Sequence, residues 1–369
     1  MTAASAMDHE YMARALALAA RGLCSTDPNP RVGCVLVRDG LVVGEGFHAK
    51  AGSAHAEVQA LLAAGEQARG ATAYVTLEPC SHHGRTGPCA DALIAAGIAR
   101  VVYASLDPNP QVSGAGAARL QAAGIRVDSG VLAVACEALN VGFFARHRRG
   151  LPWVRIKLAA SLDGRTALAN GKSQWITSEA ARTDVHAWRA RSSAILTGAG
   201  TLKKDDPRLT VRDESLPLLG RKPLRVVLDR ALLVSPSARL FAEPGPVLII
   251  TESQNTVAIE AIRARGAEVM VFAAGSGLRE VLQELARREC NEVWVEAGAK
   301  LAGLFLQMGL ADELMVYLAP HLLGQDAAPL AILPMLDDLQ NRWRYRYQDV
   351  RAIGPDLRLT LAPVHSGEQ

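Results

Sequence analysis

Predicted strands and helices alternate along almost the whole chain, and this alternation restricts the fold to sheets covered by helices. In the first half, β-rich runs at 32–37 and 41–47 are joined by Asp39-Gly40, which is a strong hairpin signal. A hairpin pairs its strands antiparallel, so we expect a mixed α/β sheet rather than a purely parallel one. Further strands are expected at 71–77 and 100–106, and helices at 11–21, 56–64 and 90–96, with one more repeat of the pattern up to Val131.

The sequence changes character around 146–152, where a basic run is followed by Gly150 and Pro152. A polar stretch that contains such breakers indicates a joint between domains, so we place the domains at 1–147 and 151–369. The basic run is expected to be a solvated linker, with an anion-binding patch as the alternative.

The second half begins again with a strand, in which Val154, Ile156 and Leu158 alternate with Arg155 and Lys157. This period of two is typical of a strand with one buried face. Further strands are expected at 194–197, 224–228, 247–251, 268–272, 292–296 and 313–318. Helices are expected between them at 178–191, 257–265, 278–288 and 301–308. We therefore predict a second, larger α/β domain.

The composition excludes several classes of protein. A length of 369 residues agrees with two or three domains of about 150 residues each. The 40 Lys and Arg residues against 37 Asp and Glu residues leave no excess of cations for a nucleic-acid backbone. Six cysteines are too few for a disulfide scaffold and indicate a reducing compartment.

Nothing near the N-terminus reads as a targeting or membrane segment. The apolar run Ala15–Ala20 is flanked by arginines and is far shorter than the roughly 20 residues that span a bilayer. The first residues include Asp8 and Glu10 and lack the basic leader of a secretory signal. We expect a cytoplasmic protein without membrane or nucleic-acid partners.

His55, Cys80 and Cys89 are expected to form a zinc site, because one imidazole and two thiolates suit this borderline-soft cation. Three protein ligands leave the fourth tetrahedral position to water, as in catalytic sites, whereas a structural site is usually closed by a fourth Cys or His. His82 and His83 lie between the two cysteines and could close it. The alternative is an isolated histidine with two buried cysteines and no metal.

Glu57 lies two residues after His55, and in a regular helix the two side chains would diverge by about 200°. Both can approach one metal only if His55 lies at or before the first turn. From there Glu57 can move a proton from water to a ring nitrogen and to a departing amine. Zinc deaminases carry a His-x-Glu…Pro-Cys-x-x-Cys pattern, and this chain follows it except that eight residues separate Cys80 from Cys89.

Longer motifs surround these residues in both halves of the chain. In the first half they are Asp27–Cys34, His55–Val58, Glu78–Cys89 and Asp107–Pro110, and in the second Lys157–Arg165, Ser173–Ser178, Asp205–Thr210 and Glu296–Gly298. Together they resemble the bifunctional riboflavin-biosynthesis family that joins diaminohydroxyphosphoribosylaminopyrimidine deaminase to 5-amino-6-(5-phosphoribosylamino)uracil reductase. The resemblance covers nearly the whole chain, and the long loop between the cysteines distinguishes it from cytidine and tRNA-adenosine deaminases.

The resemblance implies two successive reactions. A cytidine-deaminase-like domain, with helices on both faces of its mixed sheet, hydrolyses the 2-amino group of a phosphorylated diaminopyrimidinone with the help of Zn²⁺. A dihydrofolate-reductase-like α/β domain then uses NADPH to reduce the ribosyl chain to ribityl. The family also implies a homodimer or a higher homo-oligomer.

The resemblance assigns roles to particular residues of the first half. It implies that His55, Cys80 and Cys89 hold the metal and that Glu57 moves the proton. It also places Asn29 and Asp107 in the pyrimidine pocket. For these two, side chains that hold proline-containing turns are an equally good interpretation.

In the second half the resemblance implies NADPH and substrate contacts. The implied NADPH contacts are Ala159, Trp175, Thr201, Asp205, Gly298, Ala299, Lys300, Leu301, Ala302, Gly303 and Leu304. The implied substrate contacts are Ser173, Arg189, Leu209, Arg212 and Glu296. Arg189 and Arg212 are expected to clamp the sugar phosphate, because guanidinium binds phosphate bidentately.

Catalytic roles in the second half are expected for Lys157, Asp205 and Glu296, which would orient the sugar and manage its proton. Lys157 lies on the polar face of its predicted strand, so a solvent-facing lysine is the alternative. The segments 197–201 and 296–303 each follow a predicted strand and can supply backbone N–H groups to a phosphate. The alternative is that the glycines of these two segments serve only to form tight turns.

Two other functions remain open on the residues alone. A nucleic-acid base deaminase with an appended domain would need a basic or aromatic groove, and only 5% of residues are aromatic. A zinc-stabilised regulatory protein that senses NADP would not need an open metal site with Glu57 beside it.

Overall fold

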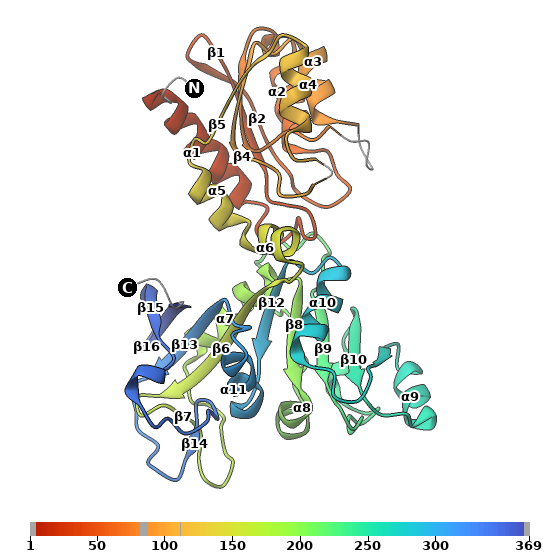
Figure 1. Cartoon of the computed structure of the whole chain (residues 1–369), viewed down its shortest axis with the longest axis vertical. Helices are drawn as coiled ribbons and strands as arrows, with labels where there is room; N and C mark the ends of the chain where they lie inside the picture. Colours follow the sequence, from red (N-terminus) through yellow and green to blue (C-terminus); the bar gives the residue numbers. More distant parts are fainter. Residues whose placement is uncertain (1–4, 82–86, 111, 365–369) are drawn as a thin grey trace. The chain divides into compact units, whose positions relative to one another are not determined.

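The computed structural model describes residues 5–81, 87–110 and 112–364 and divides into two compact units (Figure 1). Unit 1 comprises Met1–Leu151 and Pro217–Gly220, and unit 2 comprises Pro152–Leu216 and Arg221–Gln369. Each unit contains one main sheet with its own buried core. The units are therefore described separately.

The sheet of unit 1 has five strands in the order β2-β1-β3-β4-β5. They are β1 (Gly33–Arg38), β2 (Leu41–Phe47), β3 (Thr72–Leu77), β4 (Arg100–Ser105) and β5 (Arg126–Ser129). Strand β1 pairs antiparallel with β2 and β3, whereas β3, β4 and β5 run parallel. The predicted mixed sheet and its hairpin are confirmed, and Asp39 and Gly40 at the turn both have positive φ, 50° and 77°.

Helices cover both faces of this sheet. They are α1 (Ala6–Ala20), α2 (Ala56–Ala64), η1 (Gly65–Ala68), α3 (Cys89–Ala95), α4 (Ala115–Ala122), α5 (Ala133–Leu139) and α6 (Val141–Arg149). One core cluster joins α2, α3 and α4 to the sheet, and another joins α1 and α5 to its opposite face. Helix α2 lies so close to β2 that a Cβ added at Gly46 would be 2.4 Å from the Ala56 carbonyl oxygen. This contact fixes the start of α2, where two of the predicted site residues lie.

The basic run at 146–149 is helical, whereas the sequence indicated a linker. It forms the last turn of α6, which ends at Gly150 in the left-handed conformation. Phe143 and Phe144 are buried, and the Arg148 guanidinium, one turn after Phe144 on the same face, lies 4.5 Å from the centre of the Phe144 ring. Cations at a helix C-terminus are favoured by the helix dipole, which accounts for a basic final turn.

Unit 2 contains a nine-stranded sheet in the order β11-β10-β9-β8-β12-β6-β13-β16-β15 and a two-stranded sheet β14-β7. The strands are β6 (Trp153–Ser161), β7 (Arg165–Ala167), β8 (Ala194–Gly198), β9 (Leu224–Leu228), β10 (Val247–Thr251), β11 (Glu268–Val271), β12 (Glu292–Glu296), β13 (Glu313–Ala319), β14 (Ala328–Pro329), β15 (Tyr345–Ile353) and β16 (Asp356–Pro363). From β11 to β13 the neighbouring strands pair parallel, and β16 and β15 add an antiparallel edge.

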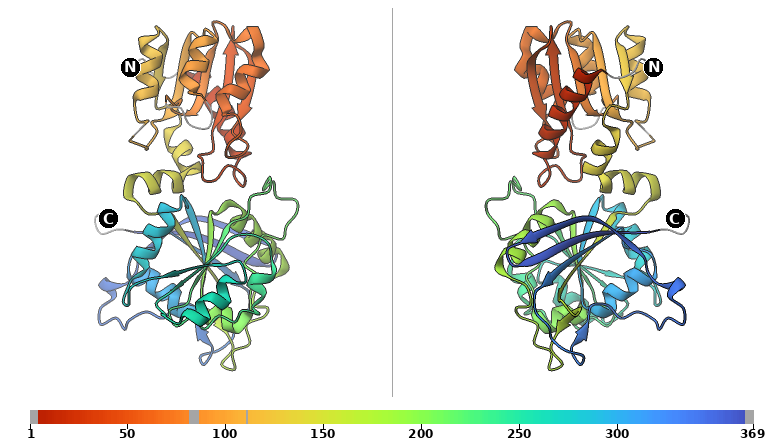
Figure 2. Two further views of the ribbon diagram at one scale, coloured as in Figure 1. Left: turned by 90° about the vertical axis from the view of Figure 1, so that its right-hand side faces the viewer. Right: turned by 90° about the vertical axis from the view of Figure 1, so that its left-hand side faces the viewer.

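Helices lie on both sides of the nine-stranded sheet (Figure 2). They are α7 (Glu179–Arg191), α8 (Ala199–Asp205), η2 (Arg239–Ala242), α9 (Thr256–Arg263), α10 (Leu278–Arg287), α11 (Ala299–Gln307) and η3 (Leu339–Asn341). The strand and helix predictions between 153 and 319 are confirmed with small shifts of their ends. The sequence patterns gave no indication of α8 or of the β15–β16 hairpin. Most residues of β15 are exposed, so this strand lacks the one-sided burial that produces a readable period.

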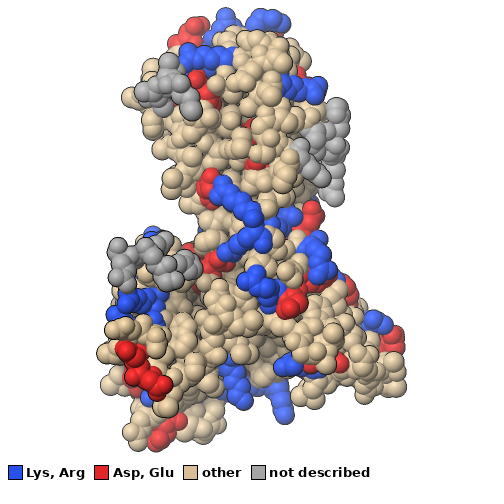
Figure 3. Space-filling model, viewed as in Figure 1, with Lys and Arg blue, Asp and Glu red and all other residues tan. Residues whose placement is uncertain are grey.

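Charges of both signs are interspersed on the face of the molecule shown in Figure 3. Among the described residues, no helix has the length and apolar character needed to cross a membrane.

Candidate active sites

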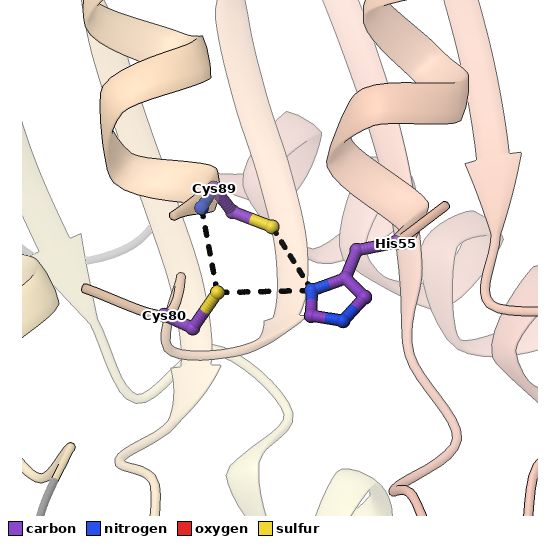
Figure 4. A group of neighbouring side chains, drawn as sticks. All are labelled: His55, Cys80 and Cys89. Atoms are coloured by element: carbon purple, nitrogen blue, oxygen red, sulfur yellow. Dashed lines mark hydrogen bonds between the residues drawn. The ribbon is translucent and has the colours of Figure 1, made fainter. Parts of the chain in front are cut away.

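The three predicted zinc ligands converge at one end of unit 1 (Figure 4). His55 is the N-cap of α2, Cys80 follows β3 after a Glu-Pro pair, and Cys89 is the first residue of α3. The His55 Nδ1 atom lies 3.2 Å from Cys89 Sγ and 3.7 Å from Cys80 Sγ. All three potential ligand atoms lie within 4.8 Å of one another. One imidazole nitrogen and two sulfurs at this spacing fit a tetrahedral zinc ion with one position left open.

The N-cap position of His55 resolves the geometry that the His-x-Glu spacing posed. His55 has extended backbone angles, φ −71° and ψ 164°. The direction of its side chain is therefore not set by the rotation of about 100° per residue of α2. Both His55 and Glu57 can therefore face the same site. His82 and His83, the other predicted candidates for a metal ligand, lie outside the described residues.

The proton affinities of the side chains at this site are shifted, those of Cys80 and Glu57 among them. The Cys80 thiol has its pKa lowered to about 4, mainly by hydrogen bonding from Cys89 and also from His55. Glu57 is only 4% exposed, and its burial, together with the nearby Cys80, raises the pKa of its carboxyl group to about 7. A carboxyl group whose pKa lies near neutrality can both accept and donate a proton under physiological conditions.

Asn29, a predicted pocket residue, is bound to a histidine that the sequence analysis did not identify. The Asn29 side-chain amide donates to His48 Nε2 at 3.0 Å, because His48 Nδ1 donates to the Ala54 carbonyl oxygen at 3.3 Å. The His48 ring also meets the His55 ring edge-on at 5.2 Å between centroids. Burial lowers the pKa of His48, which favours the neutral ring. The only sequence signal was a histidine directly after a strand, which is too common to identify a site.

Asp107, the other predicted pocket residue, is buried and holds a local turn. Its Oδ1 accepts the Asn109 backbone N–H at 2.8 Å. The neighbouring Glu78, which the sequence analysis did not single out, accepts backbone N–H groups of Asp107, Gly114 and Ala117 at 3.0–3.3 Å. Glu78 thereby joins the end of β3 to the loop after β4 and to the start of α4.

In unit 2 the two predicted phosphate segments lie beside each other. Strands β8 and β12 are parallel neighbours, so their carboxyl ends meet at one edge of the sheet. Residue 198 precedes α8 and residue 298 is the N-cap of α11, so both segments lead into helix starts. The Thr197 hydroxyl donates to the Glu296 carbonyl oxygen at 2.6 Å, and a Cβ added at Gly298 would lie 3.8 Å from Thr201 Oγ1.

Lys157 and Glu296, two of the predicted catalytic residues, lie opposite each other on the adjacent strands β6 and β12. The Lys157 ammonium group lies 5.9 Å from the centre of the Tyr317 ring. Burial lowers the pKa of Lys157, while the Glu296 charge opposes that shift. Among the described residues, no hydrogen bond or ion pair joins the third predicted catalytic residue, Asp205, to either of them.

Arg189 does not offer the free guanidinium group expected of a phosphate clamp. Its Nε and Nη2 donate to the two Glu296 carboxylate oxygens at 2.5 and 2.7 Å, and its Nη1 donates to the Thr210 carbonyl oxygen at 2.9 Å. Arg212 is exposed, and within the described part of the chain its guanidinium group makes no hydrogen bond or ion pair. The two arginines are thus unequal, because one is engaged by the protein and the other is available.

The remaining predicted contacts differ in how accessible they are. Trp175 is 68% exposed, and the Arg182 guanidinium lies 4.4 Å from the centre of its ring. Leu209 is buried in the core and has a positive φ of 52°. Gly303 packs under Ile332, whose carbonyl oxygen would be 2.0 Å from an added Cβ. Partly or fully exposed positions among the other predicted contacts are Ala159, Ser173, Thr201, Asp205, Gly298, Ala299, Lys300, Leu301 and Leu304, whereas Ala302 is buried.

Comparisons with known proteins match both units. Residues 5–105 match the cytidine and deoxycytidylate deaminase zinc-binding region, and residues 152–359 match the RibD C-terminal domain. Over 367 residues the chain is 51% identical to the riboflavin biosynthesis protein RibD of Escherichia coli (strain K12), covering 96% of this chain and 99% of that protein.

Solved structures of RibD proteins are also similar to this chain over nearly its full length. Acinetobacter baumannii RibD, form 1, has a TM-score of 0.92 at 44% identity and covers 97% of this chain and 99% of that one. A diaminohydroxyphosphoribosylaminopyrimidine deaminase/5-amino-6-(5-phosphoribosylamino)uracil reductase from Thermotoga maritima has a TM-score of 0.86 at 35% identity, with the same coverage.

Proposed function

Because the chain belongs to the RibD family of riboflavin biosynthesis proteins, we propose that its two units act in succession on one phosphorylated pyrimidine. The chain is a bifunctional deaminase and reductase of riboflavin biosynthesis that uses zinc and NADPH. We assign deamination to residues 1–147 and reduction to residues 151–369. A nucleic-acid base deaminase or an NADP sensor would not account for a match to RibD proteins along the whole chain.

The substrates that we propose are those named for the Thermotoga relative. The first reaction hydrolyses the 2-amino group of 2,5-diamino-6-(5-phosphoribosylamino)pyrimidin-4-one, giving the uracil and ammonia. The second transfers a hydride to the opened ribosyl chain of that product and yields the ribityl chain. The phosphate is common to both substrates, so each unit requires a site for it.

In unit 1 we assign His55, Cys80 and Cys89 to the metal and Glu57 to proton transfer. Zinc, when bound, supplies Lewis acidity that activates water near neutral pH. Glu57 accepts a proton from the attacking water and delivers it to the ring nitrogen as the C–O bond forms. It then moves the remaining proton of that oxygen to the amine, which leaves as ammonia when the C–N bond breaks. Its burial supports this role, because a carboxyl group with a pKa of about 7 exchanges a proton readily in either direction.

Pyrimidine recognition in unit 1 is assigned to Asn29 and Asp107. Asn29 donates to His48 through its side-chain NH2 group, so its amide oxygen can accept a hydrogen bond from the edge of the pyrimidine. Asp107 accepts the Asn109 backbone N–H at 2.8 Å, which fixes its carboxylate in the loop after β4.

In unit 2 we assign substrate contacts to Ser173, Leu209 and Arg212. The Arg212 guanidinium is the available cation for the sugar phosphate. Arg189 contributes by holding Glu296, so it acts on the substrate through that carboxylate. NADPH supplies the hydride and is assigned to the segments after β8 and β12, together with Ala159, Trp175 and Asp205.

We assign to Lys157 and Glu296 the task of orienting the sugar and managing its proton. Their opposition across β6 and β12 places an ammonium group and a carboxylate at the carboxyl edge of the sheet. The Lys157 ammonium group can donate to a sugar hydroxyl, and the Glu296 carboxylate can accept from one, as the chain opens and is reduced. Asp205, whose pKa burial raises, is assigned to the same task and to the cofactor.

The wider setting is also a proposal. The chemistry requires a small phosphorylated substrate and no nucleic acid, and the family implies a homodimer or higher homo-oligomer. No disulfide joins any of the six cysteines, all of which lie among the described residues, and this agrees with a cytoplasmic location. Light scattering of the purified protein and fractionation of the producing cells would test these two points.

The convergence of His55, Cys80 and Cys89 beside a buried Glu57 is the observation that supports the proposed chemistry best. The test supplies the diaminopyrimidinone phosphate to the purified protein and measures ammonia, with NADPH oxidation following in the same reaction. One zinc per chain is expected by elemental analysis. Metal-loaded protein that releases no ammonia would contradict the proposal.

A further inference from the structure

The segment that carries Arg212 is attached to α7 at two points. Arg189 donates to the Thr210 carbonyl oxygen at 2.9 Å, and the Arg212 backbone N–H donates to His186 Nδ1 at 3.3 Å. His186 and Arg189 are three residues apart on α7, so they lie on the same face of the helix. The first attachment comes from a residue already engaged by Glu296, and the second comes from a histidine that has no assigned role.

The state of the His186 ring follows from this hydrogen bond. A backbone N–H can only donate, so Nδ1 must be unprotonated and Nε2 carries the ring hydrogen. Burial and the positive charges of Arg189 and Arg212 lower the pKa of His186 to about 4. His186 is therefore a neutral acceptor for this N–H at physiological pH.

The direction of the Arg212 side chain depends on how firmly its own backbone is held. Leu209 anchors the preceding turn in the core, but Arg212 itself is exposed. Among the described residues, the His186 contact is the one hydrogen bond recorded for Arg212. Without it, the guanidinium group would sample more orientations before substrate binds, and fixing it would cost free energy on binding.

We propose that His186 is a positioning residue for the reductase, whose Nδ1 holds the Arg212 backbone so that the guanidinium group is oriented toward the substrate phosphate. This inference rests on the proposed phosphate-binding role of Arg212. It adds a residue that does not itself touch the phosphate.

Two substitutions of His186 separate this role from helix packing. In His186→Asn, the amide oxygen is the same number of bonds from Cα as Nδ1, so the acceptor is retained. In His186→Leu, the acceptor is lost at similar volume. Asn and His have similar helix propensities, so the Asn variant leaves α7 comparably stable. The same two substitutions at Thr183, an exposed position of α7, serve as controls.

The measurement is the steady-state kinetics of the full-length protein with the deaminated uracil substrate and NADPH. In His186→Leu we expect KM for the uracil substrate to rise about fivefold, with KM for NADPH and kcat within about twofold. In His186→Asn we expect all three values within about twofold of the native protein. In the Arg212→Ala background, His186→Leu should add nothing, because its effect passes through that guanidinium group.

Several outcomes would overturn the inference. A native KM in His186→Leu would show that the contact is dispensable, and an equal loss in His186→Asn would assign the effect to packing. A rise in KM for both ligands, or a full additional effect in the Arg212→Ala background, would also contradict it. Because His186 and Arg212 lie in unit 2, kcat and KM for NADPH report whether that unit of each variant is folded. Absence of NADPH oxidation by the native protein would instead contradict the proposed function itself.

Discussion

Arg189 on α7 and Glu296 at the end of β12 form a bidentate ion pair, with N–O distances of 2.5 and 2.7 Å. Burial alone would raise the pKa of Glu296, but the Arg189 guanidinium outweighs it and lowers that pKa to about 2. The carboxylate is further held by the Trp294 indole N–H at 2.8 Å. A permanently charged carboxylate therefore lies opposite Lys157 across the β6–β12 pair.

Glu296→Gln is expected to abolish reduction and to weaken unit 2. The amide cannot balance the buried Arg189 charge, and breaking such a pair costs about 3 kcal/mol of unfolding free energy. We expect kcat for NADPH oxidation to fall roughly a hundredfold, while ammonia release stays within about twofold. Glu243→Gln, which breaks the more exposed pair with Arg208, is the control and should leave both activities unchanged. Full NADPH oxidation by Glu296→Gln would contradict the assigned role.

Arg212→Ala is expected to weaken binding of the reductase substrate specifically. Loss of a charge-assisted contact to phosphate should raise KM for the uracil substrate by roughly tenfold to a hundredfold. KM for NADPH should stay within about twofold, which steady-state kinetics with each ligand varied in turn would show. Arg279→Ala removes another exposed arginine of unit 2 and is the control. Equal losses for both ligands would mean that the phosphate contact is misassigned.

Glu57→Gln is expected to stop deamination without loss of metal. The amide keeps the size of the buried side chain but cannot move a proton, so ammonia release should fall by roughly a thousandfold. Zinc content should stay at one per chain, and NADPH oxidation of the deaminated substrate should be unaffected. Glu66→Gln, an exposed glutamate just after α2, is the matched control. If the reductase activity were lost as well, the two sites would not be independent.

Gly116→Ala is expected to damage the zinc site through the backbone. An added Cβ would lie 1.8 Å from the Pro79 carbonyl oxygen, directly before the ligand Cys80, so α4 must move away. That movement also disturbs the hydrogen bonds from Gly114 and Ala117 to Glu78. We expect lower zinc content and less ammonia release, measured beside unchanged NADPH oxidation. Gly87→Ala, where an added Cβ meets no atom of the described residues within 4 Å, should retain zinc.

Asp8→Asn is expected to lower the stability of unit 1 in a pH-dependent way. Asp8 is buried and accepts from Arg100, Tyr74 and the Ser5 backbone. Burial opposes its charge, but these donors, with Arg100 the strongest, lower the pKa of Asp8 below its ordinary value of 3.8. The stabilisation is therefore complete above about pH 5 and is lost as pH falls through the folded-state pKa.

At pH 7 we expect the Asp8→Asn variant to lose about 2 kcal/mol of unfolding free energy. The difference from the native protein should shrink below about pH 4, where the native carboxylate is protonated in the unfolded chain. Urea titration followed by retained deaminase activity would measure it. Asp91→Asn, which breaks a surface pair with Arg119, should change stability by less than about 1 kcal/mol. A difference that stayed constant with pH would contradict the charge-based explanation.

Local patterns in the sequence were sufficient for much of the fold and for the metal site. The Asp39-Gly40 turn, the period of two in β6 and the strand–helix alternation are each decided by interactions among neighbouring residues. The convergence of the three proposed zinc ligands was predictable because metal chemistry restricts which residue types can serve, whatever the fold. The position of His55 before the first turn of α2 followed from the spacing to Glu57, and the structure confirms it.

The sequence by itself indicated most of the strands and helices and which three side chains are suited to hold zinc, because these depend on backbone period, turn chemistry and donor type. Only the tertiary structure decided which charged groups are paired and which are free. Arg189 and Arg212 look equivalent along the chain, but Glu296, 107 residues from Arg189, reaches it only because β12 runs under α7. Such partners are set by strand order and packing across long separations, and no short pattern in the sequence encodes them.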